Sequence, residues 1–364
     1  SRGAVVVGHT EVMTQVLQCG GVVVYQLLSG REVATESMEA AQMANYMYLI
    51  VNTLDRSAIA IDAAWDVDGL YSLGERLGVT IRGAVYTHFH FDHCGGKVPA
   101  MFTGGVDLPP LPGAREVERR GGRVWAGAGD VAAIREQCGV ESATPLEDGS
   151  CLECGDLVLH TLSTPGHTPG SICVFATPQC LSPRGALGGS LQNEKWHKAE
   201  NGLLITGDTL FVGSCGRVDF PESDEGHMLR SLSRLSTMHP DVIVLPGHAY
   251  SPKPFTTIGA ERDWNVMVQM GLSRVPAPPS LPPCCAGGGA GACGPRGFVV
   301  GRKVRIAARH RDRGERPEDG ENAFGVLQSF DAARGEYSVR RLPQGDVVRV
   351  APDALAPASR KPAL

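Results

Sequence analysis

The chain has 364 residues, of which 42% are hydrophobic, and a formal net charge of −5. This composition is typical of a globular protein and allows one large domain with a smaller second one. No apolar run reaches the roughly 18 residues that a membrane span needs, which excludes a membrane-spanning protein.

The charge is divided unevenly along the chain. Residues 1–283 carry 20 basic and 30 acidic side chains, a net of −10, whereas the rest carries 14 basic and 9 acidic, a net of +5. Residues 276–295, PAPPSLPPCCAGGGAGACGP, are too poor in bulky apolar side chains to pack. We therefore expect an N-terminal extension at 1–21, a catalytic domain at 22–275, a linker at 276–295, a small β-barrel domain at 296–355 and a tail at 356–364.

The eleven cysteines show no disulfide framework. Cys151 and Cys154 form one C-x-x-C pair, and no second pair follows at zinc-finger spacing. Reduced thiols and a cytoplasmic location are the expectation. The first residue is Ser1 and not a methionine, which leaves an organellar location open.

The predicted elements alternate between strands and helices. Strands are expected at 22–28, 46–51, 58–62, 83–88, 157–163, 203–206 and 241–248, and helices at 37–44, 66–78, 129–139 and 222–240. Two stretches, 103–114 and 181–202, have the composition of surface loops.

Four of the predicted strands are each followed by potential metal ligands. The strand at 83–88 runs into THFHFDHCGG, which holds three histidines and an aspartate within six positions; the other three lead to TPGHTPGS, TGD and LPGH. Ligand sites in layered α/β proteins commonly form beyond the ends of strands. The candidate ligands are His88, His90, Asp92, His93, His167, Asp208 and His248.

Seven ligands are too many for one tetrahedral ion. Imidazole and carboxylate oxygen are the usual ligands of zinc, and a site with bound water needs only three or four protein groups. The set therefore predicts two divalent ions that share a bridging ligand, roughly 3.5–4 Å apart. We expect zinc, with iron or manganese as alternatives.

The order H-x-H-x-D-H, TPGHTPGS, TGDTLF and LPGH resembles the metallo-β-lactamase superfamily, in particular its glyoxalase II branch, over about residues 22–272. The resemblance implies an α/β fold, an αββα sandwich with the metals at the edge between two sheets. It also implies one metal on His88, His90 and His167 and another on Asp92, His93 and His248, with Asp208 bridging. Asp92 would be catalytic, holding the metal-bridging hydroxide in position.

The glyoxalase II branch implies hydrolysis of thioesters such as S-D-lactoylglutathione, a step of methylglyoxal detoxification. Tyr250 matches a tyrosine of the glutathione pocket, and Arg217 falls where that branch has a basic residue. Asp219 stands where the branch has a second tyrosine, which is a departure. The expected partner is therefore a small-molecule thioester, which is glutathione-linked in the branch that the chain resembles. For Arg217, a structural ion pair with Asp219 is the interpretation that competes with substrate binding.

Two other activities stay open at this stage. GRVDFP and residues 256–265 resemble persulfide dioxygenases and unassigned glyoxalase-like proteins as much as they resemble glyoxalase II. Similarity to a persulfide dioxygenase implies a single iron on His88, His167 and Asp208. A lactone hydrolase of the same superfamily is the other alternative. Nucleic acid is not an expected partner, because the catalytic part is acidic.

The C-terminal part has short β-type segments at about ten-residue spacing, which resemble a small SH3- or Tudor-like barrel. Its basic side chains predict either a solvated face or contact with a protein partner. They are Arg302, Lys303, Arg305, Arg309, Arg311 and Arg313.

Overall fold

A computed structural model describes residues 14–19, 21–154, 157–177, 194–275 and 280–281, together with five C-terminal strands between 303 and 357. The chain divides into two compact units, Ser1–Pro282 and Pro283–Leu364. Within the described residues, no helix is long and apolar enough to cross a bilayer.

The first unit contains an eight-stranded sheet in the order β11-β1-β2-β3-β4-β5-β6-β7. Its strands are β11 (Glu194–Lys198), β1 (Thr14–Cys19), β2 (Val22–Leu28), β3 (Tyr46–Asn52), β4 (Ser57–Ile61), β5 (Thr80–Tyr86), β6 (Arg123–Gly127) and β7 (Ala143–Leu146). Strands β1 to β4 form an antiparallel meander, and β4 to β7 run parallel.

A second sheet of six strands has the order β14-β13-β12-β10-β9-β8. Its strands are β14 (Thr256–Thr257), β13 (Ile243–Pro246), β12 (Leu203–Gly207), β10 (Ile172–Ala176), β9 (Leu157–Ser163) and β8 (Cys151–Cys154). The neighbouring strands β12 and β13 are parallel, so both strands deliver their carboxyl ends to the same edge of the sheet.

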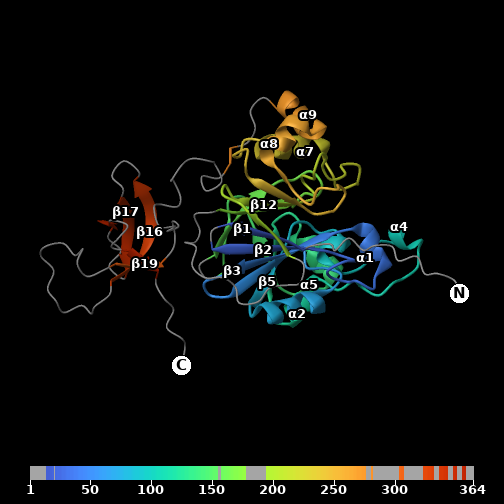
Figure 1. Cartoon of the computed structure of the whole chain (residues 1–364), viewed down its shortest axis with the longest axis horizontal. Coiled ribbons are helices and arrows are strands. Elements are labelled where there is room, and N and C mark those ends of the chain that lie inside the picture. The colour runs from blue at the N-terminus through green and yellow to red at the C-terminus, as the bar shows by residue number, and fades with distance from the viewer. Residues whose placement is uncertain are drawn as a thin grey trace, which may run out of the picture. The chain divides into compact units, whose positions relative to one another are not determined.

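Helices lie on the outer faces of both sheets, which gives an αββα sandwich (Figure 1). Figure 1 shows α2 and α5 outside the first sheet and α7, α8 and α9 outside the second. The helices are α1 (Met38–Met43), α2 (Val67–Leu77), α3 (Phe91–Cys94), α4 (Ala100–Thr103), α5 (Ala114–Arg119), α6 (Val131–Cys138), α7 (Glu225–Leu235), α8 (Ile258–Trp264) and α9 (Val266–Arg274).

The core explains why the central strands are almost wholly apolar. All seven residues of β3 are buried, because one face meets the helices and the other meets the second sheet. On the helix side, Leu70, Leu73 and Leu77 of α2 pack into the main cluster, as their spacing predicts. Asp66 caps the start of α2 through the Gly69 amide, and Gly78 ends it in the left-handed conformation.

Two of the sequence-based assignments were wrong, one of an N-terminal extension and one of a surface loop. Residues 14–19, expected in an extension, form β1, which lies inside the first sheet between β2 and β11. Residues 194–198, expected in a loop, form β11, which pairs in parallel with β1. Both errors concern strands near the sheet edge, whose pairing joins segments some 180 residues apart and leaves little local signal.

The second unit contains a five-stranded antiparallel sheet in the order β18-β17-β16-β15-β19. Its strands are β15 (Lys303–Ile306), β16 (Ala323–Asp331), β17 (Glu336–Leu342), β18 (Val347–Val350) and β19 (Leu355–Pro357). The β character of this part agrees with the expectation, whereas closure into a barrel stays a prediction. Of the predicted linker, 276–295, only 280–281 are described, and Arg302, Arg309, Arg311 and Arg313 lie outside the described residues.

Candidate metal centre

Four predicted ligands sit in the turn after β5. The strand ends at Tyr86, and the Thr87 amide donates a hydrogen bond to Asp62 Oδ1 (2.7 Å), which fixes the exit of the chain. The short helix α3 follows and carries Asp92 and His93, and it ends where Gly95 adopts a positive φ of 78°.

The other three ligands come from the edge of the second sheet. His167 follows β9, Asp208 follows β12 and His248 follows β13, each by one to four residues. Gly247 makes the last approach possible: a Cβ at this position would lie 2.4 Å from Asp208 Oδ1, so any other residue would push against the carboxylate. The edge therefore brings together side chains from three separate strand ends.

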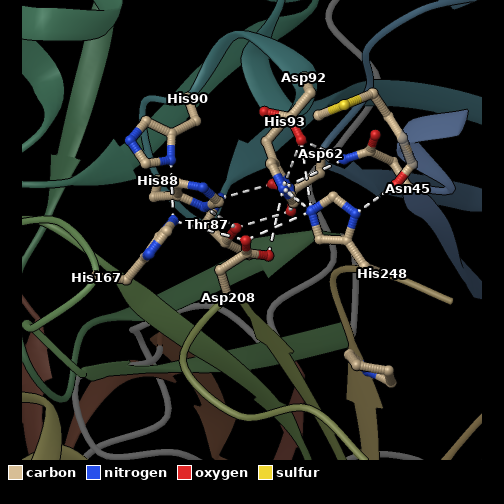
Figure 2. A network of polar contacts seen from close by, with 12 residues as sticks. Asn45, Asp62, Thr87, His88, His90, Asp92, His93, His167, Asp208 and His248 are labelled. Atoms are coloured by element: carbon tan, nitrogen blue, oxygen red, sulfur yellow. Dashed lines mark hydrogen bonds and ion pairs between the residues drawn. The ribbon is translucent and has the colours of Figure 1, made fainter. Parts of the chain in front are cut away.

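The structure places all seven predicted ligands in one cluster (Figure 2). Three overlapping groups have ligand atoms within 4.8 Å of one another: His88, His90 and His167; His88, His93 and Asp208; and Asp92, His93 and His248. Asp208 lies between the outer two groups, with Oδ2 3.6 Å from His167 Nε2 and 3.4 Å from His248 Nε2. This is the position that a shared carboxylate ligand requires.

Unsatisfied polar atoms indicate that the cluster is built for ions. His88 Nε2 and Asp208 Oδ1 are buried and have no hydrogen-bond partner. Buried polar atoms are normally satisfied, and the desolvation penalty for one left alone is about 1–3 kcal/mol. Divalent ions bound to nitrogen and carboxylate oxygen would satisfy both atoms, so the residues present fit the two-metal interpretation.

The second ring nitrogen of each histidine is also held. His88 Nδ1 lies 3.0 Å from Thr87 Oγ1, His90 Nε2 2.9 Å from Glu222 Oε1, His93 Nδ1 2.9 Å from Asp62 Oδ2, His167 Nδ1 2.8 Å from the Arg217 carbonyl and His248 Nδ1 2.8 Å from the Met43 carbonyl. Such outer contacts set which nitrogen faces a metal and how the ring is turned.

Burial and mutual charge set the protonation of the cluster. Burial holds the pKa of His88 well below its usual value, so its ring is neutral and able to bind a metal. Burial opposes ionisation of Asp208, but His248 and His93 outweigh it and hold the pKa of Asp208 well below its usual value. The carboxylate is therefore charged.

Several residues that support the site were not identified from the sequence. Asn45 Nδ2 donates to Asp92 Oδ2 (2.9 Å), and Trp65 Nε1 donates to the Asp92 carbonyl (3.0 Å). Asp62 Oδ2 lies 2.9 Å from His93 Nδ1, and Glu222 Oε1 lies 2.9 Å from His90 Nε2. Only for Asp62 did the sequence hold a signal, a lone acidic residue at the end of an apolar strand.

The two predicted substrate residues lie at opposite sides of the cluster. The Tyr250 ring stacks on His248, with centroids 4.5 Å apart and planes inclined by 10°, and the residue is 61% exposed. Arg217 makes a bidentate ion pair with Asp219 (2.8 Å for each contact), and its guanidinium lies over the Phe220 ring. The competing interpretation of Arg217, an ion pair, is thus observed, and the role in substrate binding stays a prediction.

The remaining histidines and Cys94 stand apart from the ligand groups. Among the described residues, His160, His197, His227 and His239 belong to none of the groups, and His9 and His310 lie outside the described residues. Cys94 is buried, and its thiol donates to the Phe89 carbonyl (3.0 Å). The buried position agrees with a spectator thiol and gives no support to a redox role.

Comparisons with known proteins agree with the geometry. A sequence profile described as the metallo-beta-lactamase superfamily matches residues 42–177 and 196–248. The probable polyketide biosynthesis zinc-dependent hydrolase BaeB of Bacillus velezensis is 25% identical over 211 residues, which are 58% of this chain and 75% of that protein. Mitochondrial persulfide dioxygenase ETHE1 of Bos taurus is 25% identical over 239 residues, 65% of this chain and 76% of that protein.

A solved structure, a metallo-β-lactamase from Staphylococcus aureus, has a TM-score of 0.50 and 21% identity, and the match covers 72% of this chain and 69% of that one. This likeness concerns the fold alone.

Proposed function

The chain belongs to the metallo-β-lactamase superfamily, and on this basis we propose that it is a binuclear metal-dependent hydrolase of thioesters. The observation that carries the proposal is the pair of complete ligand groups with Asp208 between them. Two complete ligand groups are what a two-metal hydrolase needs, whereas a single iron on His88, His167 and Asp208 would leave the other four candidate ligands without a metal.

Each of the two ions would be held by its own set of ligands. His88, His90 and His167 would hold one ion, Asp92, His93 and His248 the other, and Asp208 would touch both. When bound, two such ions lower the pKa of water to near neutrality and polarise a carbonyl oxygen, so hydrolysis needs no serine or cysteine nucleophile.

Asp92 is held firmly enough to orient groups at the reaction centre. Asn45 fixes one carboxylate oxygen, and Trp65 fixes the backbone carbonyl of the same residue. Trp65 Nε1 also donates to Asn45 Oδ1 (3.2 Å), which closes a small network behind Asp92. A carboxylate held by such a network keeps its position when substrate arrives.

The substrate class is the finer part of the proposal. The exposed Tyr250 ring, which stacks on His248, offers an apolar and hydrogen-bonding surface beside the ligand groups. Arg217 is engaged by Asp219, so a glutathione carboxylate would have to displace this ion pair. We therefore propose a thioester with weak selectivity for glutathione, S-D-lactoylglutathione being one member of the class.

One observation favours a second candidate: the match to a persulfide dioxygenase over 65% of the chain. That activity would use a single iron on His88, His167 and Asp208 and would consume oxygen.

Metal analysis and a substrate panel separate the candidates. Purified protein is analysed for bound metals and assayed with glutathione thioesters, simple thioesters, lactones and glutathione persulfide. The proposal predicts two ions per chain, with zinc ahead of iron or manganese, and thioester cleavage without oxygen uptake. One iron per chain with persulfide-dependent oxygen uptake would favour the second candidate, and lactone cleavage without thioester cleavage would contradict both.

A further inference from the structure

Glu222 lies behind His90, on the side of the ring that faces away from the ligand cluster. Its Oε1 is 2.9 Å from His90 Nε2, and the other ring nitrogen, Nδ1, is 2.9 Å from His167 Nε2. One nitrogen of His90 therefore faces the neighbouring ligand and the other faces a carboxylate. The contact is partly shielded, with the two side chains 17% and 29% exposed.

The segment that carries Glu222 is tied to another ligand of the same group. Ser223 Oγ donates to the His167 carbonyl (2.7 Å), and the Asp224 amide donates to the Gly166 carbonyl (2.8 Å). His167 Nδ1 in turn contacts the Arg217 carbonyl (2.8 Å). The backbone around Glu222 is thus anchored on both sides to the loop of His167.

The charges of the two outer groups are unequal without Glu222. The group of Asp92, His93 and His248 has its own carboxylate ligand and a second carboxylate, Asp62, behind His93. The group of His88, His90 and His167 has three histidine ligands, no carboxylate of its own, and shares only Asp208. Among the described residues, Glu222 is the carboxylate that gives this group the counterpart of Asp62.

We propose that Glu222 is a positioning residue that selectively strengthens metal binding by the His88–His90–His167 group. Its carboxylate holds the proton of His90 on Nε2, which leaves the Nδ1 lone pair free to face the neighbouring ligand His167. This inference rests on the proposed function in that it assumes divalent ions in the cluster. It adds a residue that the predicted seven-ligand set does not include.

Metal titration of the stripped full-length protein tests the inference without an activity assay. Zn²⁺ is titrated against a chromophoric chelator for the wild type, Glu222→Leu, Glu222→Gln and the control Glu225→Gln. Glu225 is exposed and contacts Arg274, so its change leaves the cluster untouched. Co²⁺ spectra of the same proteins report the ligand field at each site.

The expected result is a loss of about 10–100-fold in affinity for one of the two ions in Glu222→Leu, with the other unchanged. Glu222→Gln should lose less, because its amide oxygen still accepts a hydrogen bond but carries no charge. Wild-type affinity for both ions in Glu222→Leu would overturn the inference. Equal weakening of both ions would overturn it too, since the effect would then be structural.

The wild-type stoichiometry is read separately. A single ion in the wild type would count against the two-metal hydrolase, whereas the role of Glu222 would still be decided by whether Glu222→Leu weakens that ion.

Discussion

Asp62 lies directly behind His93, with Oδ2 2.9 Å from Nδ1 and both side chains no more than 2% exposed. The same carboxylate accepts hydrogen bonds from the amide and the hydroxyl of Thr87, each at 2.7 Å. Thr87 Oγ1 also lies 3.0 Å from His88 Nδ1. One buried aspartate therefore orients two ligands, one of them directly and the other through a hydroxyl.

The first prediction concerns Asp62→Asn. Asp62 has a φ of +52°, a conformation that asparagine tolerates, so the backbone should be kept while the charge is lost. We expect metal affinity of the Asp92–His93–His248 group to fall by about 10–100-fold. Zn²⁺ titration checks this, with Asp55→Asn as a control away from the cluster. Unchanged affinity would mean that Asp62 serves only to hold Thr87.

The second prediction concerns Asp208→Ala. This change removes the carboxylate that lies between the two ligand groups, so the rate of thioester hydrolysis should fall by more than about 100-fold. That loss exceeds the effect expected from changing a residue that only contacts a metal ligand, such as Asp62. The circular dichroism spectrum should match that of the wild type, because the sandwich stays folded. The control is Asp241→Ala, whose side chain is 73% exposed. Near-normal turnover in Asp208→Ala would rule out the bridging role.

The third prediction separates the two candidate substrate residues. Tyr250→Ala removes an aromatic surface worth about 0.5–1.5 kcal/mol, so KM should rise by roughly 2–10-fold with kcat little changed. Arg217→Ala should change KM less, because Asp219 already engages the guanidinium and the side chain is 60% exposed. Steady-state kinetics on the preferred thioester measure both. A larger rise for Arg217→Ala would show that the substrate displaces Asp219.

The fourth prediction concerns thiol reactivity and pH. Burial raises the pKa of Cys173 to about 12, whereas an unfolded cysteine ionises near 9.0. The neutral thiol of the folded state therefore contributes stability that is fully present below pH 9 and is lost as the pH rises toward 12. Iodoacetamide at pH 9 should label the exposed Cys151 and spare Cys173 in the native protein. Denatured protein is the control, and equal labelling of both native thiols would contradict the burial argument.

The fifth prediction is that the first unit works alone. A chain ended after Pro282 should fold, bind metal and turn over like the full chain, since every predicted ligand precedes residue 249. Ending it at Val275 should cost some stability, because Arg234 loses its two hydrogen bonds to the Ser280 carbonyl and keeps only Asp148 and Ser163 as partners. Thermal unfolding and metal content measure both. Loss of metal from the chain ended after Pro282 would assign the C-terminal unit to the catalytic part. Retained activity would show that catalysis does not need this unit, and contact with a protein partner would stay its predicted role.

The sequence alone was enough for the superfamily, the αββα sandwich and the seven clustered side chains. Three features carry this information locally: the compact H-x-H-x-D-H run, the apolar strands and the glycines in the turns that follow them. His167, Asp208 and His248 could be placed together because strands of a layered sheet end at a common edge. The helical face of Leu70, Leu73 and Leu77 followed from its spacing in the same way.

Only the tertiary structure decided which residues stand behind the ligands. Asp62 and His93 are 31 residues apart, Asn45 and Asp92 are 47 apart, and His90 and Glu222 are 132 apart. The pairing of β1 with β11 was equally invisible. A carboxylate or an amide has no periodicity that marks its partner, and such contacts form only once the two sheets have packed and fixed the distances between segments remote in the chain.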